Sequence, residues 1–401
     1  MKKLSLACAL LVALTTAAVA LGATRADPGV EANSILIGGT APLSGEASAG
    51  AGVARGAEAY FKWVNARGGV NGRKIEYKYL DDGYEPARTV QATRQLVQQD
   101  KVFAIFNALG TSNNLAIRSF LNQSKVPQLF SASGATTFGR DYRQYPYTIG
   151  YIPSYAAEGK IYGQYILKTR PRAKIAVLYQ DDDYGNDLVA GLRKGLGAKA
   201  KQIVARAGYD PTATDVSSQV AQLKGSKADT FVIFAFGKFS LQAFFAANKL
   251  GWRPKITIVN AVASASGLMA IPPARSTEGA VSIVFTKDPA NPAWAKDKGL
   301  KLFQTVMKRY YPDGVKSGYA AAGASSAYTM VDVLRKAGKN PTRASVLNAA
   351  THLNERGNPF LLPGIVVKTA PNDRFPVAQL KLQRWHNKRW NIFGKMLVAK
   401  P

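Results

Sequence analysis

Short runs of β-type residues alternate with helical stretches along most of this 401-residue chain. The first series of strands is expected at residues 35–39, 75–80, 102–106 and 126–130, and the second at 174–179, 203–207, 230–234 and 255–259. Helices are expected between them, at residues 53–65, 86–99, 113–121, 185–196, 216–223 and 239–250. Each helix carries the chain back to start a parallel neighbouring strand. The sequence therefore predicts an α/β fold with two doubly wound parallel sheets.

The last third of the chain departs from this alternation. Helices are expected at residues 292–310, 318–337 and 342–351, and a β-hairpin is expected from residues 375–382 and 389–393. No long linker rich in Pro, Gly or Ser separates the two α/β units. Because bead-like domains are usually joined by such linkers, several short crossovers between the units fit this sequence better.

Residues 1–26 carry the pattern of a secretory signal peptide. Lys2 and Lys3 precede a run from 4 to 21 that is apolar or small apart from one Ser and two Thr. A membrane anchor is the weaker alternative, because the run is short and rich in Ala and Thr. Lipidation at Cys8, the one cysteine, is also weaker because the apolar run continues beyond it. We therefore expect a cleavable signal and a periplasmic location.

The sequence lacks the motifs of the common enzyme classes. It has no P-loop, no G-x-S-x-G nucleophile motif, and too few Cys and His for a zinc site. The glycine-rich run at 50–56 resembles a dinucleotide-binding motif, but its last spacing is one residue too long. The acidic run at 181–183 lacks the closing Glu of a calcium loop, which favours helix capping instead. We expect no catalytic residues, no cofactor and no metal.

The net charge is strongly positive. The chain has 53 Lys and Arg against 25 Asp and Glu, a formal charge of +28. Such a balance first suggests nucleic acid, an anionic surface or anionic ligands. The basic residues are nevertheless spread over many segments, and no helix-turn-helix, RRM or KH motif is present. We therefore expect no nucleic acid, and interpret the charge as an attraction for anionic ligands or an anionic membrane surface.

Three loops follow expected strands and are candidates for ligand binding, at residues 42–45, 108–114 and 131–137. Doubly wound sheets bind ligands at the carboxyl ends of their strands. The second loop places the hydroxyls of Thr111 and Ser112, and unpaired backbone N–H groups, at a helix N-terminus. Such a site suits a carboxylate, because the helix dipole and the free donors both favour an anion. An ordinary helix cap explains the same pattern equally well.

Four segments together carry a family resemblance. They are ILIGGTAPLSGEASAGAGVARGAEAYFKWVNARGGVNGRKIEYKYLDDGYEP at 35–86, VFAIFNALGTSNNLAIRSFLNQSKVPQLFSASGATTF at 102–138, IAVLYQDDDYGNDLVAGLRKGL at 175–196 and LLPGIVVKTAPNDRFPVAQLKLQRW at 361–385. They resemble the type I periplasmic substrate-binding proteins of ABC transporters, in the leucine/isoleucine/valine-binding family. The resemblance covers nearly the whole chain after the signal.

The resemblance implies two lobes joined by a three-crossover hinge, with a ligand in the cleft. One lobe would comprise residues 33–149 and 280–357, and the other residues 150–279 and 358–401. Ligand would close the hinge, and the closed monomer would dock on the permease subunits of an ABC importer. One alternative is a ligand-sensing receptor subunit with the same fold, but the signal peptide argues against a cytoplasmic regulator of this kind. The other is a hydrolase, for which the sequence offers no nucleophile–base pair.

The resemblance also implies roles for seven residues. Thr111 and Ser112 would hold a ligand carboxylate, and the 131–137 loop would add backbone and hydroxyl contacts. The residues concerned in that loop are Ser133, Ala135 and Thr136. Tyr151 and Tyr209 would wall the pocket, with packing between the lobes as the alternative for both.

One departure from the family pattern concerns the ligand. In the family's amino-acid binders, an acidic residue in the loop matching 260–266 pairs with the ligand ammonium, whereas this loop reads NAVASAS. Enclosing an ammonium without a partner costs several kcal/mol. The chain also resembles the subgroup that takes aromatic or other non-amino carboxylates. The sequence hypothesis is a ligand with a carboxylate but no obligatory α-ammonium.

Overall fold

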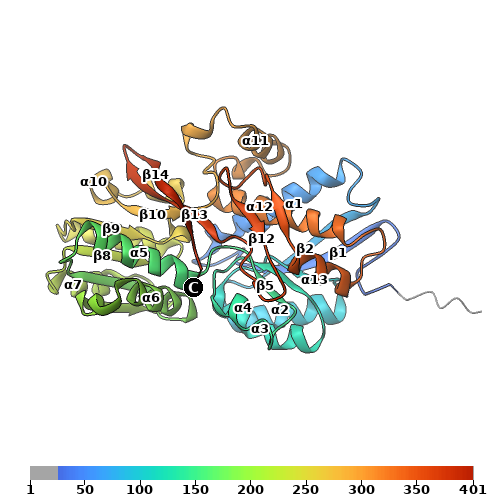
Figure 1. Ribbon diagram of the computed structural model, residues 1–401, viewed down its shortest axis with the longest axis horizontal. Helices are drawn as coiled ribbons and strands as arrows, with labels where there is room; N and C mark the ends of the chain where they lie inside the picture. Colours follow the sequence, from blue (N-terminus) through green and yellow to red (C-terminus); the bar gives the residue numbers. More distant parts are fainter. Residues whose placement is uncertain (1–25, 401) are drawn as a thin grey trace, which may run out of the picture.

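In the computed structural model, residues 26–400 form two α/β lobes that lie side by side (Figure 1). The first lobe is built on a five-stranded sheet of order β2-β1-β3-β4-β5, in which every pairing is parallel. Its strands are β1 (Ser34–Ala41), β2 (Lys74–Asp81), β3 (Ile105–Phe106), β4 (Gln128–Ser131) and β5 (Thr148–Gly150). The predicted first series of strands is confirmed, and β5 is an additional strand.

The helices of the first lobe come from two parts of the chain. They are α1 (Ala51–Asn65), α2 (Pro86–Arg94), α3 (Thr111–Gln123), α4 (Thr137–Arg140), α11 (Lys298–Tyr310), α12 (Gly318–Lys336) and α13 (Arg343–Thr351). Glycines allow α1 and α12 to pack backbone against backbone. A Cβ at Gly323 would lie 1.9 Å from the carbonyl oxygen of Val53, and one at Gly56 would lie 2.3 Å from that of Ala320.

The second lobe is built on a seven-stranded sheet of order β14-β13-β10-β9-β8-β6-β7. Its strands are β6 (Ile175–Gln180), β7 (Ile203–Tyr209), β8 (Thr230–Phe234), β9 (Ile256–Val259), β10 (Val281–Val284), β13 (Gln379–His386) and β14 (Arg389–Val398). β13 and β14 pair antiparallel, and their turn residues Asn387 and Lys388 have φ values of 51° and 57°. Both residues of a type I′ hairpin turn need such positive values. The predicted hairpin is confirmed.

The second lobe contains one long helix that the sequence did not indicate. α5 (Tyr155–Thr169) packs along α6 (Asp183–Leu196), and the other helices are α7 (Ser217–Gly225), α8 (Lys238–Lys249), and the short α9 (Ser266–Met269) and α10 (Ala274–Thr277). Gly159 and Gly163 on α5 face α6. A Cβ at these positions would lie 2.2 Å from the Leu188 carbonyl oxygen and 2.6 Å from that of Leu192. The glycines therefore set the distance between the two helices.

The chain crosses between the lobes three times, after β5, after β10 and before β13. Two strands differ from the expected division. β10 lies in the second sheet, although residues 280–357 were expected in the first lobe. β12 (Val366–Lys368) was expected in the second lobe but pairs with β11 (Asn354–Arg356). β11 belongs with the first lobe, because its Glu355 accepts a 3.0 Å hydrogen bond from Thr329 on α12. The position of a strand along the chain does not reveal which sheet it joins.

The signal-peptide prediction concerns residues that lie outside the described part of the chain, apart from Ala26. Within residues 26–400, none of the helices combines the length and the apolar character needed to cross a membrane.

Candidate functional site

A cavity of about 130 Å³ lies between the lobes at the carboxyl ends of strands from both sheets. First-lobe residues that line it follow β3, β4 and β5, and second-lobe residues follow β8, β9 and β10. A buried water needs roughly 10–15 Å³ of such volume, so this cavity has room for a small organic molecule.

Aromatic side chains from both lobes form much of the cavity wall. Tyr84 of the first lobe stacks on Phe236 of the second, with ring centroids 5.5 Å apart. Phe236 also meets Tyr319 edge to face at 6.0 Å, and Tyr155 meets Tyr184 at 4.9 Å. These pairs hold one another in place, so the wall is apolar and rigid and suits an apolar side chain or ring.

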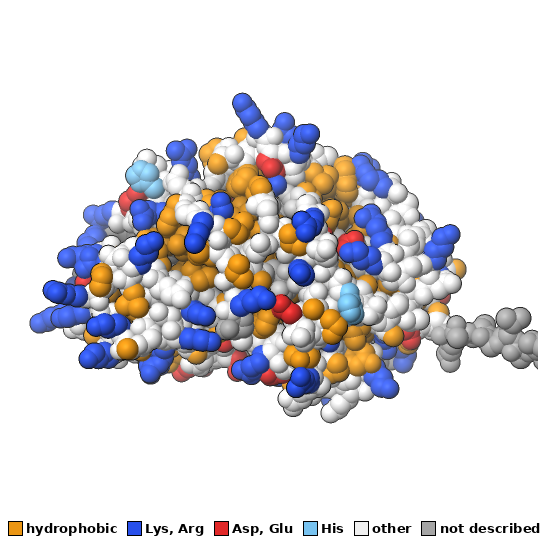
Figure 2. All heavy atoms as spheres, in the orientation of Figure 1, with side chains coloured by type: hydrophobic (Ala, Val, Ile, Leu, Met, Phe, Trp, Pro, Cys, Tyr) orange, Lys and Arg blue, Asp and Glu red, His pale blue; other side chains and the backbone are white. Residues whose placement is uncertain are grey.

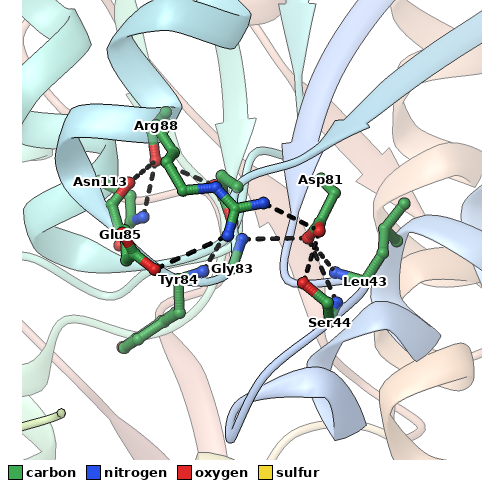
Figure 3. Close-up of polar contacts among 10 residues, drawn as sticks. Leu43, Ser44, Asp81, Gly83, Tyr84, Glu85, Arg88 and Asn113 are labelled. Carbon is green, nitrogen blue, oxygen red and sulfur yellow. Dashed lines mark hydrogen bonds and ion pairs between the residues drawn. The ribbon is translucent and has the colours of Figure 1, made fainter.

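Asp81, at the end of β2, fixes the loop that carries Tyr84 (Figure 3). Its carboxylate accepts hydrogen bonds from the N–H groups of Leu43 and Gly83, at 2.8 and 3.0 Å, and from the Ser44 hydroxyl at 2.5 Å. Burial acts to raise the pKa of Asp81, but the hydrogen bonds from Ser44, Gly83 and Leu43 lower it to about 2. The loop is therefore tied to an ionised carboxylate at neutral pH.

The first-lobe end of the cavity presents hydrogen-bond donors. α3 begins at Thr111, and its cap residue Gly110 has a φ of 103° and no side chain to satisfy the first N–H groups. Within residues 26–400, no backbone or side-chain oxygen accepts from the N–H groups of residues 111–113. The Thr111 hydroxyl lies 2.7 Å from that of Ser133. Asn107 also lines the cavity, is 3% exposed, and its Nδ2 has no partner among the described residues.

The second-lobe end presents acceptors. Asp288 lines the cavity, and its carboxylate accepts hydrogen bonds from the Ser266 hydroxyl and from the N–H of Ala290, the latter at 3.0 Å. Burial raises the pKa of Asp288, because these bonds only partly replace its hydration. The Nε2 of Gln383 donates to the Ser264 hydroxyl and the Ile283 carbonyl. The side-chain oxygen of Gln383 is therefore the group left free to accept. Sequence reasoning missed Asp288 because it did not recognise β10, which precedes it.

Of the seven residues predicted for the site, Thr111 and Tyr151 line the cavity. Ser133 lies directly behind Thr111 and orients its hydroxyl. The Tyr151 hydroxyl points away into the crossover region, where it lies 2.9 Å from the Thr329 hydroxyl. Tyr151 therefore presents its ring to the cavity and ties that wall to α12.

Ser112 and Thr136 instead connect the lobes outside the cavity. The Ser112 hydroxyl donates to Asp182 at 3.3 Å, and the Thr136 N–H donates to Asp187 at 2.8 Å. Both acceptors belong to the N-terminal part of α6 in the second lobe, and Asp182 caps that helix, as predicted for the acidic run. These two contacts hold the first-lobe loops against the second lobe.

The remaining two predicted residues lie farther from the cavity. Ala135 is buried, and its N–H donates to the Ser133 hydroxyl at 3.2 Å. Tyr209 packs its ring 4.5 Å from that of Phe239, and its hydroxyl donates to Gln180 at 3.2 Å. Neither is among the cavity-lining residues.

Further contacts join the lobes on either side of the cavity. The Lys238 ammonium lies 2.8 Å from the Glu46 carboxylate, and the Tyr319 hydroxyl donates to the Val262 carbonyl at 2.9 Å. The Gln180 amide also reaches the Tyr84 hydroxyl at 3.4 Å. The two lobes are thus in direct contact around part of the cavity.

Comparisons with known proteins agree with this architecture. The family model described as periplasmic binding protein matches residues 34–389. The chain is 26% identical to Leu/Ile/Val-binding protein homolog 7 of Brucella abortus, and the alignment covers 98% of this chain and 96% of that protein.

Two solved structures share the fold. A branched-chain amino acid ABC transporter protein from Thermus thermophilus, with bound valine, has a TM-score of 0.79 at 18% identity and covers 92% of this chain and 96% of its own. An ABC-transporter solute-binding protein from Rhodopseudomonas palustris, in complex with 3,4-dihydroxybenzoic acid, has a TM-score of 0.76 at 20% identity, covering 92% and 98%. Two lobes with a cavity between them, and a family match over most of the chain, show that this chain belongs to the periplasmic binding proteins, in the type I leucine/isoleucine/valine-binding family.

Proposed function

We propose that this protein captures a small carboxylic acid in its interlobe cavity and delivers it to the permease of an ABC importer. One observation carries the proposal, namely the start of α3 at Thr111, where unpaired N–H groups meet an aromatic cavity. A carboxylate placed there would receive the helix dipole, backbone hydrogen bonds and the Thr111 hydroxyl.

The chemistry of the remaining wall supports an organic acid rather than an inorganic anion. No Lys or Arg is among the residues lining the cavity, so dipoles and hydroxyls would bind the charge. Phosphate or sulfate would leave the aromatic surface of Tyr84, Phe236 and Tyr319 without a partner. A branched or aromatic side chain would bury apolar area there, at about 25 cal/mol per Å².

The ligands of the two structural neighbours also support this chemistry. Valine and 3,4-dihydroxybenzoic acid differ in size, shape and the presence of an ammonium, but both carry a carboxylate. A carboxylate site common to the family, with a pocket of variable shape for the rest of the ligand, would explain how one fold binds both acids.

The two-lobed architecture supports the proposed delivery. We propose that the lobes rotate about the crossovers after β5, after β10 and before β13, and that the contacts of Ser112 and Thr136 with α6 form on closure. The monomer closed on its ligand would be the form that docks on the permease after export to the periplasm.

Substituting Thr111 tests the carboxylate site. Calorimetric titration with leucine, isoleucine, benzoate and phenylpropionate identifies the acids that bind. Thr111→Val should then weaken the tightest by roughly tenfold or more, because a hydrogen bond to a charged group contributes about 1.5–3 kcal/mol. The control is Thr305→Val, because the hydroxyl of Thr305 donates only to the Lys301 carbonyl within α11. Binding of none of the acids, or equal affinity in Thr111→Val, would contradict the proposal.

A further inference from the structure

Asp288 is a part-buried carboxylate that no basic side chain neutralises among the described residues. It follows β10 and lines the cavity from the second-lobe side. None of the ion pairs among residues 26–400 includes it. The neighbouring Lys287 is committed elsewhere, since its ammonium lies 2.8 Å from Asp297 and 2.9 Å from the Pro359 carbonyl. The charge of Asp288 is thus left to whatever occupies the cavity.

The two hydrogen bonds that Asp288 accepts do not use all of its acceptor capacity. The contact with the Ala290 N–H forms a local turn, which an Asp on the surface makes equally well. The contact with the Ser266 hydroxyl uses the other oxygen. A carboxylate has room for about four hydrogen bonds, so acceptor capacity remains on the cavity side. Gln383, which also lines the cavity, adds a free carbonyl oxygen.

The two ends of the cavity are therefore of opposite character. Thr111 and the first turn of α3 present donors, whereas Asp288 and Gln383 present acceptors. A ligand with a carboxylate alone would satisfy the first end and leave Asp288 desolvated without a partner, which costs free energy. A ligand that also carries a donor would satisfy both.

We propose that Asp288 selects ligands that carry a hydrogen-bond donor, an ammonium or a hydroxyl, in addition to the carboxylate. This inference rests on the proposed carboxylate site and adds a second recognition point to it. The loop at 260–266 has no acid of its own, but Ser266 in that loop is hydrogen-bonded to Asp288, which comes from the next crossover. The sequence hypothesis of a ligand without an obligatory ammonium was based on the lack of an acid in this loop. Asp288 supplies an acid beside the loop, so that argument against an ammonium no longer holds.

Two pairs of matched acids test the selection. Leucine is compared with isocaproate, which is leucine without its amino group, and para-hydroxyphenylpropionate is compared with phenylpropionate. In the native protein, the acid with the extra donor should bind roughly tenfold or more tightly than its partner in at least one pair. That difference is what a hydrogen bond to a charged group contributes. The pair that shows the preference identifies the donor as ammonium or hydroxyl.

Asp288→Asn should remove that preference while leaving isocaproate and phenylpropionate bound at least as tightly as before. The control is Asp313→Asn, an exposed carboxylate on the first lobe. Thermal unfolding checks that the variants fold. If Asp288→Asn does not fold, it is replaced by Asp288→Ser, which keeps a hydroxyl to accept from the Ala290 N–H.

The outcomes separate this inference from the proposed function. Equal affinities within both pairs, or a preference that survives in Asp288→Asn, would overturn the role of Asp288 and leave the carboxylate site standing. Thr111→Val should instead weaken all the acids that bind. Failure of all four acids to bind would overturn both proposals.

Discussion

Single residues show where sequence reasoning about the site succeeds and where it stops. The family resemblance assigned both Thr111 and Ser112 to the ligand carboxylate, yet of the two only Thr111 lines the cavity. Neighbouring residues of an α-helix point about 100° apart, and the Ser112 hydroxyl is directed to Asp182 instead. Which of them does depends on the helix orientation. Asp288 was missed for another reason, since nothing in the local sequence placed it at a strand end.

Glu158, on α5, is a residue whose titration should be visible in the stability of the protein. It is 1% exposed, and its Oε1 accepts hydrogen bonds from the Ala261 N–H at 2.7 Å and the Tyr162 hydroxyl at 2.8 Å. Burial nevertheless raises its pKa from 4.5 to about 7. The folded state thus holds this proton more tightly than the unfolded state does.

The stabilisation from Glu158 is fully present below about pH 4.5 and is lost as the pH rises through about 7. Glu158→Gln keeps the Oε1 acceptor and removes the titration. Between about pH 5 and about pH 8, the free energy of unfolding of the native protein should fall by up to about 3 kcal/mol more than that of the variant. Urea unfolding at several pH values measures this. Glu355, whose pKa burial also raises to about 7, is present in both proteins. Parallel pH profiles would contradict the buried, neutral Glu158.

At the scale of elements, most strands and helices were predictable, but β5, β10 and α5 were not. The strands preceding β5 and the hairpin of β13 and β14 were anticipated, because alternation and turn residues mark them. β5 and β10 have three and four residues and precede crossovers between the lobes. The equally short β3, β4 and β9 lie within the regular alternation of strands and helices, which indicates them. α5 was missed although it has 15 residues, and it contains two glycines that lower helix propensity. Those glycines are explained by packing against α6, a neighbour that local sequence does not reveal.

Adding a methyl group at Gly159 tests that packing. The new Cβ in Gly159→Ala would lie 2.2 Å from the Leu188 carbonyl oxygen, so α5 and α6 must move apart. We expect a loss of about 1–3 kcal/mol in the free energy of unfolding, despite the better helix propensity of Ala. Gly225→Ala, at the end of α7, is the matched control because its Cβ would meet no atom within 4 Å. Urea unfolding should show little change for the control, and equal stability of Gly159→Ala would refute the close contact.

At the scale of the whole molecule, the family resemblance carried the prediction of two lobes, and the structure supplied their contacts. The Lys and Arg residues behind the formal charge of +28 are spread along the sequence. Figure 2 shows Lys and Arg side chains spread over both lobes on the face in view, with few acidic ones among them. Within the cavity, by contrast, Asp288 is the charged residue of the lining. We therefore expect the surface charge to favour the approach of anions in general, and propose that the cavity selects among them.

A crystal structure of the protein with the acid that binds most tightly in calorimetry tests the central claim most directly. The account predicts that the lobes enclose the ligand and that its carboxylate oxygens lie about 3 Å from the Thr111 hydroxyl and the first N–H groups of α3. A ligand bound outside the interlobe cavity, or one whose carboxylate lies away from the start of α3, would contradict it.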